Sequence, residues 1–120
     1  MEANEMMRIA VEAADDKRAE NILVLDMEGL SVIADYFIIC HGNSEKQVEA
    51  IAKGIKDQMQ ERDFEVKRVE GLDGGRWVLM DLNSVIIHIF HKEERQYYNL
   101  EKLWGDAPLL TGEQVLNSDK

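Results

Sequence analysis

The sequence predicts a single α/β (α+β) domain in which a mixed β-sheet is flanked by helices. Segments with helical and strand-like patterns follow one another in the order α-β-β-α-β-β-β-α, which favours helices packed on the faces of a sheet. The 120 residues suit one domain with one core, and they contain no internal repeat. We assign the domain to residues 1–107 and a polar C-terminal tail, which can be flexible, to residues 108–120.

The first half of the chain predicts two helices around two strands. Apolar residues recur at helical spacing over residues 3–19 and again over residues 45–62, where charged residues mostly occupy the opposite side. The runs "NILVLDM" and "DYFIIC" lie between these helices, and their continuous apolar stretches are typical of strands buried on both faces. A turn at Glu28-Gly29 separates the two strands.

The second half predicts an edge strand, a hairpin and a closing helix. "FEVKRVEG" is short and charged, as expected for a strand that must not pair with another chain. "RWVLMDL" and "VIIHIF" are joined at Asn83-Ser84 and form an antiparallel hairpin. Apolar residues such as Leu100 and Trp104 then follow helical spacing in "EERQYYNLEKLW", and Gly105 ends this helix.

Composition excludes several classes of function. The formal net charge of −10 argues against free nucleic acid as a direct ligand, because phosphate recognition depends on clustered Lys and Arg, and it favours a basic protein partner. No apolar stretch approaches the roughly 20 residues of a membrane span, and the start "MEANEMM" is not typical of a targeting signal. A single cysteine suits a reducing compartment. We therefore expect a cytoplasmic protein that binds neither a membrane nor a cofactor.

The stretch "ICHGNSEKQ" joins the second strand to the second helix and allows two interpretations. Ser44 and Gln47 have the spacing of a capping box, in which the Ser44 hydroxyl accepts from the Gln47 amide and the Gln47 side chain returns to the Ser44 amide. The alternative is a nucleotide-binding or nucleotidyltransferase-like enzyme that holds a triphosphate at the Gly42-Asn43-Ser44 turn. That chemistry needs paired carboxylates for magnesium, and no Asp-x-Asp or Asp-x-Glu pair follows the turn. We expect no catalytic residues.

The cysteine and the histidines predict neither a catalytic pair nor a metal site. Cys40 and His41 are adjacent, so on a strand their side chains point to opposite faces and do not form a nucleophile and its base. Cys40 is expected to be a small core residue. His88 and His91 also point to opposite faces of one strand, and no third ligand is evident.

The hairpin carries the most informative surface. With Asn83-Ser84 as the turn, Leu82 pairs with Val85 and Met80 with Ile87, which gives one aliphatic face for the core. The opposite face suits protein binding, because aromatic anchors contribute most of the energy in such interfaces. Its residues are Trp77, Leu79, Asp81, Ile86, His88 and Phe90. Two alternatives stay open: a helix covers this second face and makes Trp77 part of the core, or a one-residue slip exchanges the two faces.

Three stretches resemble the ribosomal silencing factor family, also called the Iojap family. They are "SVIADYFIICHGNSEKQVEAIA", "RWVLMDLNSVIIHIF" and "RQYYNLEKLWGDA", in the same order as in the family, and the match runs from about Asn21 to Ala107. The resemblance implies a small mixed α/β domain related to the nucleotidyltransferase fold but without its catalytic acids or activity.

The resemblance also implies a function and a set of contacts. Family members bind the large ribosomal subunit through one of its proteins at the subunit interface, block joining of the small subunit, and so repress translation when nutrients are scarce. The family's tryptophan, aspartate and strand histidine match Trp77, Asp81 and His88, and its aromatic before "LEKLW" matches Tyr98. With Phe90 from the hairpin face, these are the candidate partner-binding residues. Many members carry glycine-aspartate where this chain has Asn83-Ser84.

Self-association is a further expectation. An apolar, aromatic face on so small a domain is often covered by a second copy of the chain, so we expect a homodimer that uses the surface taken by the ribosomal partner.

Overall fold

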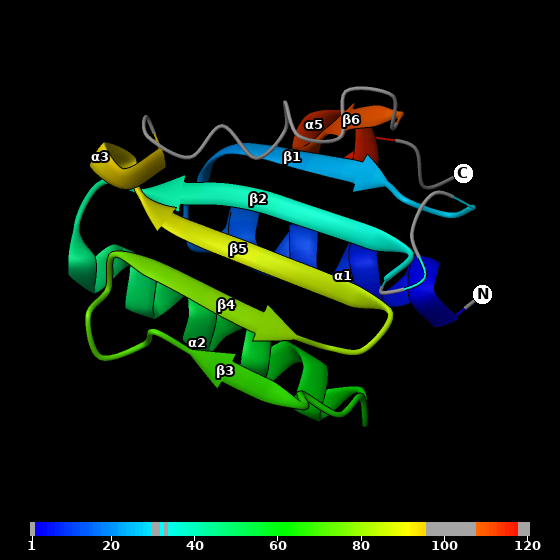
Figure 1. The fold of residues 1–120 in the computed structure, drawn as a ribbon, viewed down its shortest axis with the longest axis horizontal. Coiled ribbons are helices and arrows are strands. Elements are labelled where there is room, and N and C mark those ends of the chain that lie inside the picture. The colour runs from blue at the N-terminus through cyan, green and yellow to red at the C-terminus, as the bar shows by residue number, and fades with distance from the viewer. Residues whose placement is uncertain (1, 30–31, 33, 96–107, 118–120) are drawn as a thin grey trace.

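The computed structural model describes residues 2–29, 32, 34–95 and 108–117 (Figure 1). Within them, six strands form one mixed sheet in the order β3-β4-β5-β2-β1-β6. The strands are β1 (Glu20–Asp26), β2 (Tyr36–Gly42), β3 (Arg68–Glu70), β4 (Trp77–Asp81), β5 (Val85–His91) and β6 (Leu109–Thr111). The described helices are α1 (Glu2–Asp16), α2 (Glu45–Glu61), α3 (Lys92–Arg95) and α5 (Gly112–Leu116). The predicted fold class, one α+β domain with a mixed sheet, is confirmed.

Helices α1 and α2 contact each other and cover one face of the sheet, and Figure 1 shows both behind the strands. Each helix buries the stripe that its periodicity predicted: Met6, Ile9, Ala10 and Ala13 in α1, and Val48, Ile51, Ala52, Ile55 and Met59 in α2. These side chains and the inward residues of the strands form the larger of two apolar clusters. The main core therefore lies between the helices and the sheet.

The central strands are buried on both faces, as their continuous apolar runs predicted. Every residue of β2 from Tyr36 to Cys40 is buried. Alternate side chains enter the main core, while the others join a second, smaller cluster on the face opposite α1 and α2, formed by Leu25, Met27, Ala34, Phe37, Ile39 and Phe90. We call this second side of the sheet the open face. β2 and β5 pair in parallel, and the other described strand pairs are antiparallel.

The hairpin has the predicted register. Met80 pairs with Ile87 and Val78 with Ile89, and the Leu82 amide donates to the Val85 carbonyl across the turn at 2.9 Å. Strand β3 lies at one edge of the sheet, as its short and charged sequence predicted. A one-residue slip is therefore excluded, and the aliphatic face of the hairpin belongs to the main core.

The C-terminal segment contains two elements that were not predicted from the sequence. Strand β6 pairs with β1 at the other edge of the sheet, and Thr111 caps α5 through a reciprocal pair of hydrogen bonds with Gln114. A Cβ on Gly112 would approach the Ile22 side chain to 2.8 Å, so this segment packs closely on β1. Residues 109–116 thus add to the sheet and its helical layer, within the segment that the sequence predicts to be a polar tail. Of the closing helix predicted at residues 93–104, all but the first turn lies outside the described residues.

Candidate protein-binding surface

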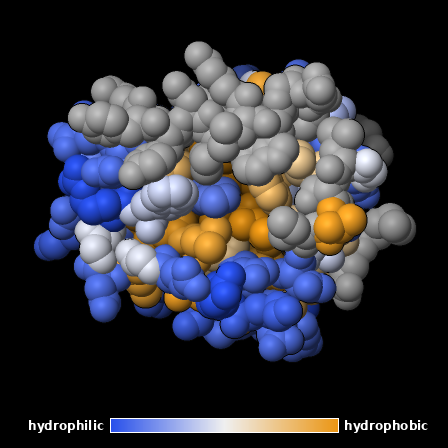
Figure 2. All heavy atoms as spheres, viewed as in Figure 1, coloured by the Kyte–Doolittle hydropathy of each residue, from blue (hydrophilic) through white to orange (hydrophobic). Residues whose placement is uncertain are grey.

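The mixed face of the hairpin lies on the open face of the sheet, which Figure 2 shows from the same side as Figure 1. Hydrophobic residues gather at its centre, with hydrophilic residues along the β3 side. We define the aromatic surface as Trp77, Leu79, Ile86, His88 and Phe90. Trp77 is 36% exposed, Leu79, Ile86 and His88 are partly buried, and Phe90 is fully buried. Among the described helices, α1 and α2 cover the other face, so the alternative in which one of them buries Trp77 is not what the fold shows.

Three rings fix the shape of this surface. The Trp77 ring lies 4.9 Å from that of Phe90 and 6.0 Å from that of His88, measured between centroids. The indole Nε1–H donates to His88 Nδ1 at 3.1 Å. Because Nδ1 accepts this bond, the neutral imidazole carries its proton on Nε2. The Trp77 ring thus packs against Phe90 and is hydrogen-bonded to His88, and these two contacts fix its orientation.

Burial determines the charge of His88. Desolvation lowers the pKa of its imidazole from 6.5 to about 4. At neutral pH the side chain is therefore uncharged, and the aromatic surface presents no positive charge at this position. A basic partner meets no repulsion there.

Asp81 lies on the open face and also stabilises the hairpin turn. Its Oδ1 accepts from the Asn83 backbone amide at 2.8 Å, and Asn83 has a φ of +79°. Its Oδ2 lies 3.7 Å from the Arg68 guanidinium, and the side chain is 22% exposed. An aspartate two residues before a turn stabilises the turn by this local hydrogen bond. Asp81 therefore shapes the hairpin as well as contributing negative charge.

A shallow hollow of about 310 Å³ lies beside the aromatic surface, lined by Glu70, Gly71, Trp77, Leu79 and His88. We call it the Trp77 hollow. It lies at the β3 side of the open face, where β3, β4 and β5 run next to each other. No sequence pattern joined Glu70 and Gly71 to the other three residues, because both precede the hairpin and are brought to it only by the pairing of β3 with β4.

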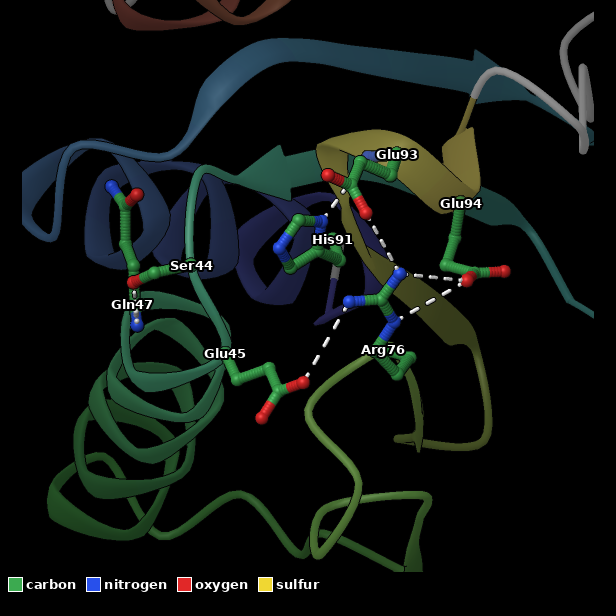
Figure 3. Close-up of polar contacts among 7 residues, drawn as sticks. All are labelled: Ser44, Glu45, Gln47, Arg76, His91, Glu93 and Glu94. Atoms are coloured by element: carbon green, nitrogen blue, oxygen red, sulfur yellow. Dashed lines mark hydrogen bonds and ion pairs between the residues drawn. The ribbon is translucent and has the colours of Figure 1, made fainter.

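The Gly42-Asn43-Ser44 turn is the start of a helix. The Ser44 hydroxyl accepts from the Gln47 amide at 3.1 Å, as predicted (Figure 3). The Gln47 side chain differs from the prediction: its oxygen accepts from the Asn43 amide at 2.7 Å, one residue earlier than expected, and its nitrogen donates to the Arg18 carbonyl at 2.9 Å. The turn and α2 are thereby tied to the end of α1. These contacts explain the polar residues of the turn without a nucleotide.

An ion-pair cluster at the end of β5 was not predicted from the sequence. The Arg76 guanidinium lies 3.6 Å from Glu45, 3.1 Å from Glu93 and 3.1 Å from Glu94 (Figure 3). The hydrogen bonds that Arg76 donates to Glu93 and Glu94 raise its pKa, and Arg76 in turn lowers the pKa of Glu93. The four residues come from the start of α2, the loop before β4, and α3. No local pattern predicts such a cluster, because its members meet only in the folded chain.

The remaining candidate residues have structural positions. Cys40 is buried in the main core, as predicted. The His91 Nδ1 accepts from the Glu93 amide at 3.2 Å, which joins β5 to α3. Across the described part of the chain, no three His, Cys, Asp or Glu side chains come together as metal ligands. Tyr98, the fifth candidate partner-binding residue, lies outside the described residues.

Comparison with known proteins gives one consistent family. The family model described as "Ribosomal silencing factor during starvation" matches residues 1–120. The "Ribosomal silencing factor RsfS" of Bacillus subtilis (strain 168) is 64% identical over 109 residues, or 91% of this chain and 92% of that protein. The protein of the same name from Halalkalibacterium halodurans is 56% identical over 117 residues, or 98% and 100% of the two chains. A crystal structure of a Chromobacterium violaceum protein matches with a TM-score of 0.84 at 33% identity, covering 88% of each chain.

Among the helices in the described ranges, none is both long and apolar enough to cross a bilayer.

Proposed function

The chain belongs to the ribosomal silencing factor family, and from this premise we propose that it represses translation by binding the large ribosomal subunit in the cytoplasm. Binding uses a ribosomal protein at the subunit interface, so that the bound factor sterically blocks joining of the small subunit. The family description names starvation, which supports nutrient limitation as the condition in which this repression acts.

The observation that carries the proposal is the aromatic surface on the open face. Trp77 is a large aromatic side chain that is 36% exposed and held from below by Phe90 and His88. Rigid, partly exposed aromatic side chains in an apolar setting are typical binding hot spots, because they lose little conformational entropy on binding. Phe90 is fully buried and supports the anchor rather than contacting a partner itself.

Charge supports a basic protein as the partner. The chain has a formal net charge of −10, which attracts a basic ribosomal protein during encounter. The neutral His88 leaves this attraction undiminished at the centre of the surface. Trp77, Asp81, His88 and Tyr98 are the proposed partner-binding residues, and Phe90 supports Trp77 and His88 through ring contacts.

Sedimentation with purified large subunits tests the proposal. Trp77→Ala is expected to weaken subunit binding at least about thirtyfold, which corresponds to a typical hot-spot loss of roughly 2 kcal/mol. Leu72→Ala is the matched control, because Leu72 is a 42% exposed apolar side chain that lies beside Ala52 and Lys53 of α2, away from the open face. The control is expected to bind as the wild type does.

Two outcomes would contradict this assignment. If thermal melting shows that Trp77→Ala is folded, and the variant still sediments with subunits as the wild type does, the open face is not the docking surface. If the wild-type protein binds large subunits but does not reduce their association with small subunits in light scattering, binding is not coupled to a steric block.

A homodimer is a second part of the proposal. In the absence of ribosomes, the same apolar surface is covered by a second copy of the chain. Analytical ultracentrifugation is expected to show a dimer that Trp77→Ala weakens and Leu72→Ala does not. A monomer at high protein concentration would remove this part and leave the subunit-binding proposal unaffected.

A further inference from the structure

A row of three side chains crosses adjacent strands at the Trp77 hollow. Glu70 of β3 pairs with Leu79 of β4, and Leu79 pairs with His88 of β5. Directly paired residues of antiparallel strands project from the same face, so the row places a carboxylate, an aliphatic side chain and an imidazole side by side on the open face. Trp77 and Gly71 complete the lining of the hollow.

Trp77 provides an aromatic wall with a fixed orientation. Its Nε1–H is engaged by His88, and its ring packs on Phe90, yet 36% of the residue is exposed. Gly71 keeps the neighbouring loop close to it: the residue has a φ of +82°, and a Cβ there would approach the Trp77 carbonyl oxygen to 2.2 Å. The close packing of the Gly71 loop against Trp77 therefore depends on glycine, because a side chain at residue 71 would push the loop away from Trp77.

The charges around the hollow favour a cation. Among the described residues of this part of the open face, Glu70 and Asp81 contribute carboxylates, Arg68 contributes a cation that pairs with both, and His88 is neutral. Arg68 lies 3.1 Å from Glu70, but both side chains are more than half exposed. Exposed ion pairs of this kind contribute little to stability, so an incoming cation can compete with Arg68 for Glu70. An acidic or phosphorylated ligand would meet two carboxylates.

We propose that the Trp77 hollow receives one Arg or Lys side chain of the basic protein partner. The aliphatic stem packs against Leu79, the cationic group lies over the Trp77 ring, and Glu70 pairs with its charge. Basic side chains combine an apolar stem with a charged end, and they are attracted to the face of an indole ring. This inference rests on the proposed function, since it specifies which group of the partner the aromatic surface recognises.

Two small molecules of nearly equal shape test the proposal without a ribosome. N-acetyl-argininamide carries the guanidinium group, and N-acetyl-citrullinamide replaces it with a neutral urea. Each is titrated into the ¹⁵N-labelled full chain, and the Trp77 indole N–H signal, identified by its absence in Trp77→Phe, is followed by NMR. The arginine compound is expected to shift this signal in a saturable way at constant ionic strength, and the citrulline compound is expected to leave it unchanged.

A variant then assigns the charge recognition to one carboxylate. Glu70→Gln is expected to weaken binding of the arginine compound roughly two- to fivefold, the range for loss of one exposed ion pair. Glu113→Gln is the control, because Glu113 is exposed on α5, which packs against β1 and β6 at the end of the sheet opposite β3. It is expected to bind as the wild type does.

The proposal is overturned if both compounds shift the signal equally, if neither shifts it, or if Glu70→Gln and Glu113→Gln weaken binding to the same extent. These results are distinct from failure of the proposed function. A chain that binds large subunits through Trp77 but does not discriminate arginine from citrulline retains its function and loses this recognition site.

Discussion

Acid is expected to destabilise the protein through His88. In the folded state, burial lowers the pKa of this imidazole to about 4, whereas in the unfolded chain it returns to about 6.5. Between these two values the unfolded state binds more protons than the folded state. The free energy of unfolding therefore increases with pH across this window, and the contribution of His88 is fully present above pH 6.5 and is lost as the pH falls to 4.

The size of this effect follows from the two pKa values. A tenfold difference in proton affinity corresponds to about 1.4 kcal/mol, so the shift to about 4 corresponds to roughly 3 kcal/mol between pH 7 and pH 4. The geometry adds a specific reason for the loss: a proton on Nδ1 cannot coexist with the Trp77 Nε1–H bond at 3.1 Å. Loss of that bond is expected to release the indole from its support.

Urea unfolding at several pH values measures the effect. His88→Gln removes the imidazole, so the free-energy difference between wild type and variant is expected to shrink by roughly 3 kcal/mol from pH 7 to pH 4, and carboxylates common to both cancel. Leu72→Ala is the control, because Leu72 does not titrate and lies beside Ala52 and Lys53 of α2, so its truncation leaves the surroundings of His88 unchanged. Its difference from wild type should be constant with pH. A constant difference for His88→Gln as well would refute the argument that His88 is buried in its neutral form.

Three further predictions concern other parts of the fold. In urea unfolding, Gly71→Ala should lose more stability than Gly29→Ala. Both glycines have a φ near +80°, where an alanine is strained by about 1–2 kcal/mol, but only at residue 71 would the new Cβ meet backbone atoms. Equal losses of stability would contradict this reasoning. Ser44→Ala should lose about 1 kcal/mol, and an unchanged melting temperature would show that the cap contributes nothing. Arg76→Gln should lower the melting temperature by an amount that added salt reduces, whereas a salt-independent loss would indicate packing instead of charge.

The sequence by itself determined the features that depend on neighbouring residues. The stripes of α1 and α2 follow from spacing within one turn and the next, and the Ser44 cap follows from a contact three residues away. The sequence also predicts the hairpin register, because strand side chains alternate with a period of two and a turn at Asn83-Ser84 gives one face made only of aliphatic residues. The sequence left a one-residue slip open, and the strand pairing of the folded chain excludes it. The predicted register alone indicates that Trp77 and His88 lie on the same side of the hairpin.

Tertiary structure decided which of these side chains meet partners from distant parts of the chain. Segments far apart in sequence are joined where β2 pairs in parallel with β5 and where β6 pairs with β1. Strand β6 has three residues in a polar segment, which is too short for an alternating pattern that would predict a strand. Glu70 reaches the Trp77 hollow only through β3, and Arg76 meets Glu45 and Glu94 only at the end of the folded sheet. Periodicity records which side of an element is apolar, whereas ion pairs and strand order depend on distances in space, which hydrophobic packing of the whole chain sets.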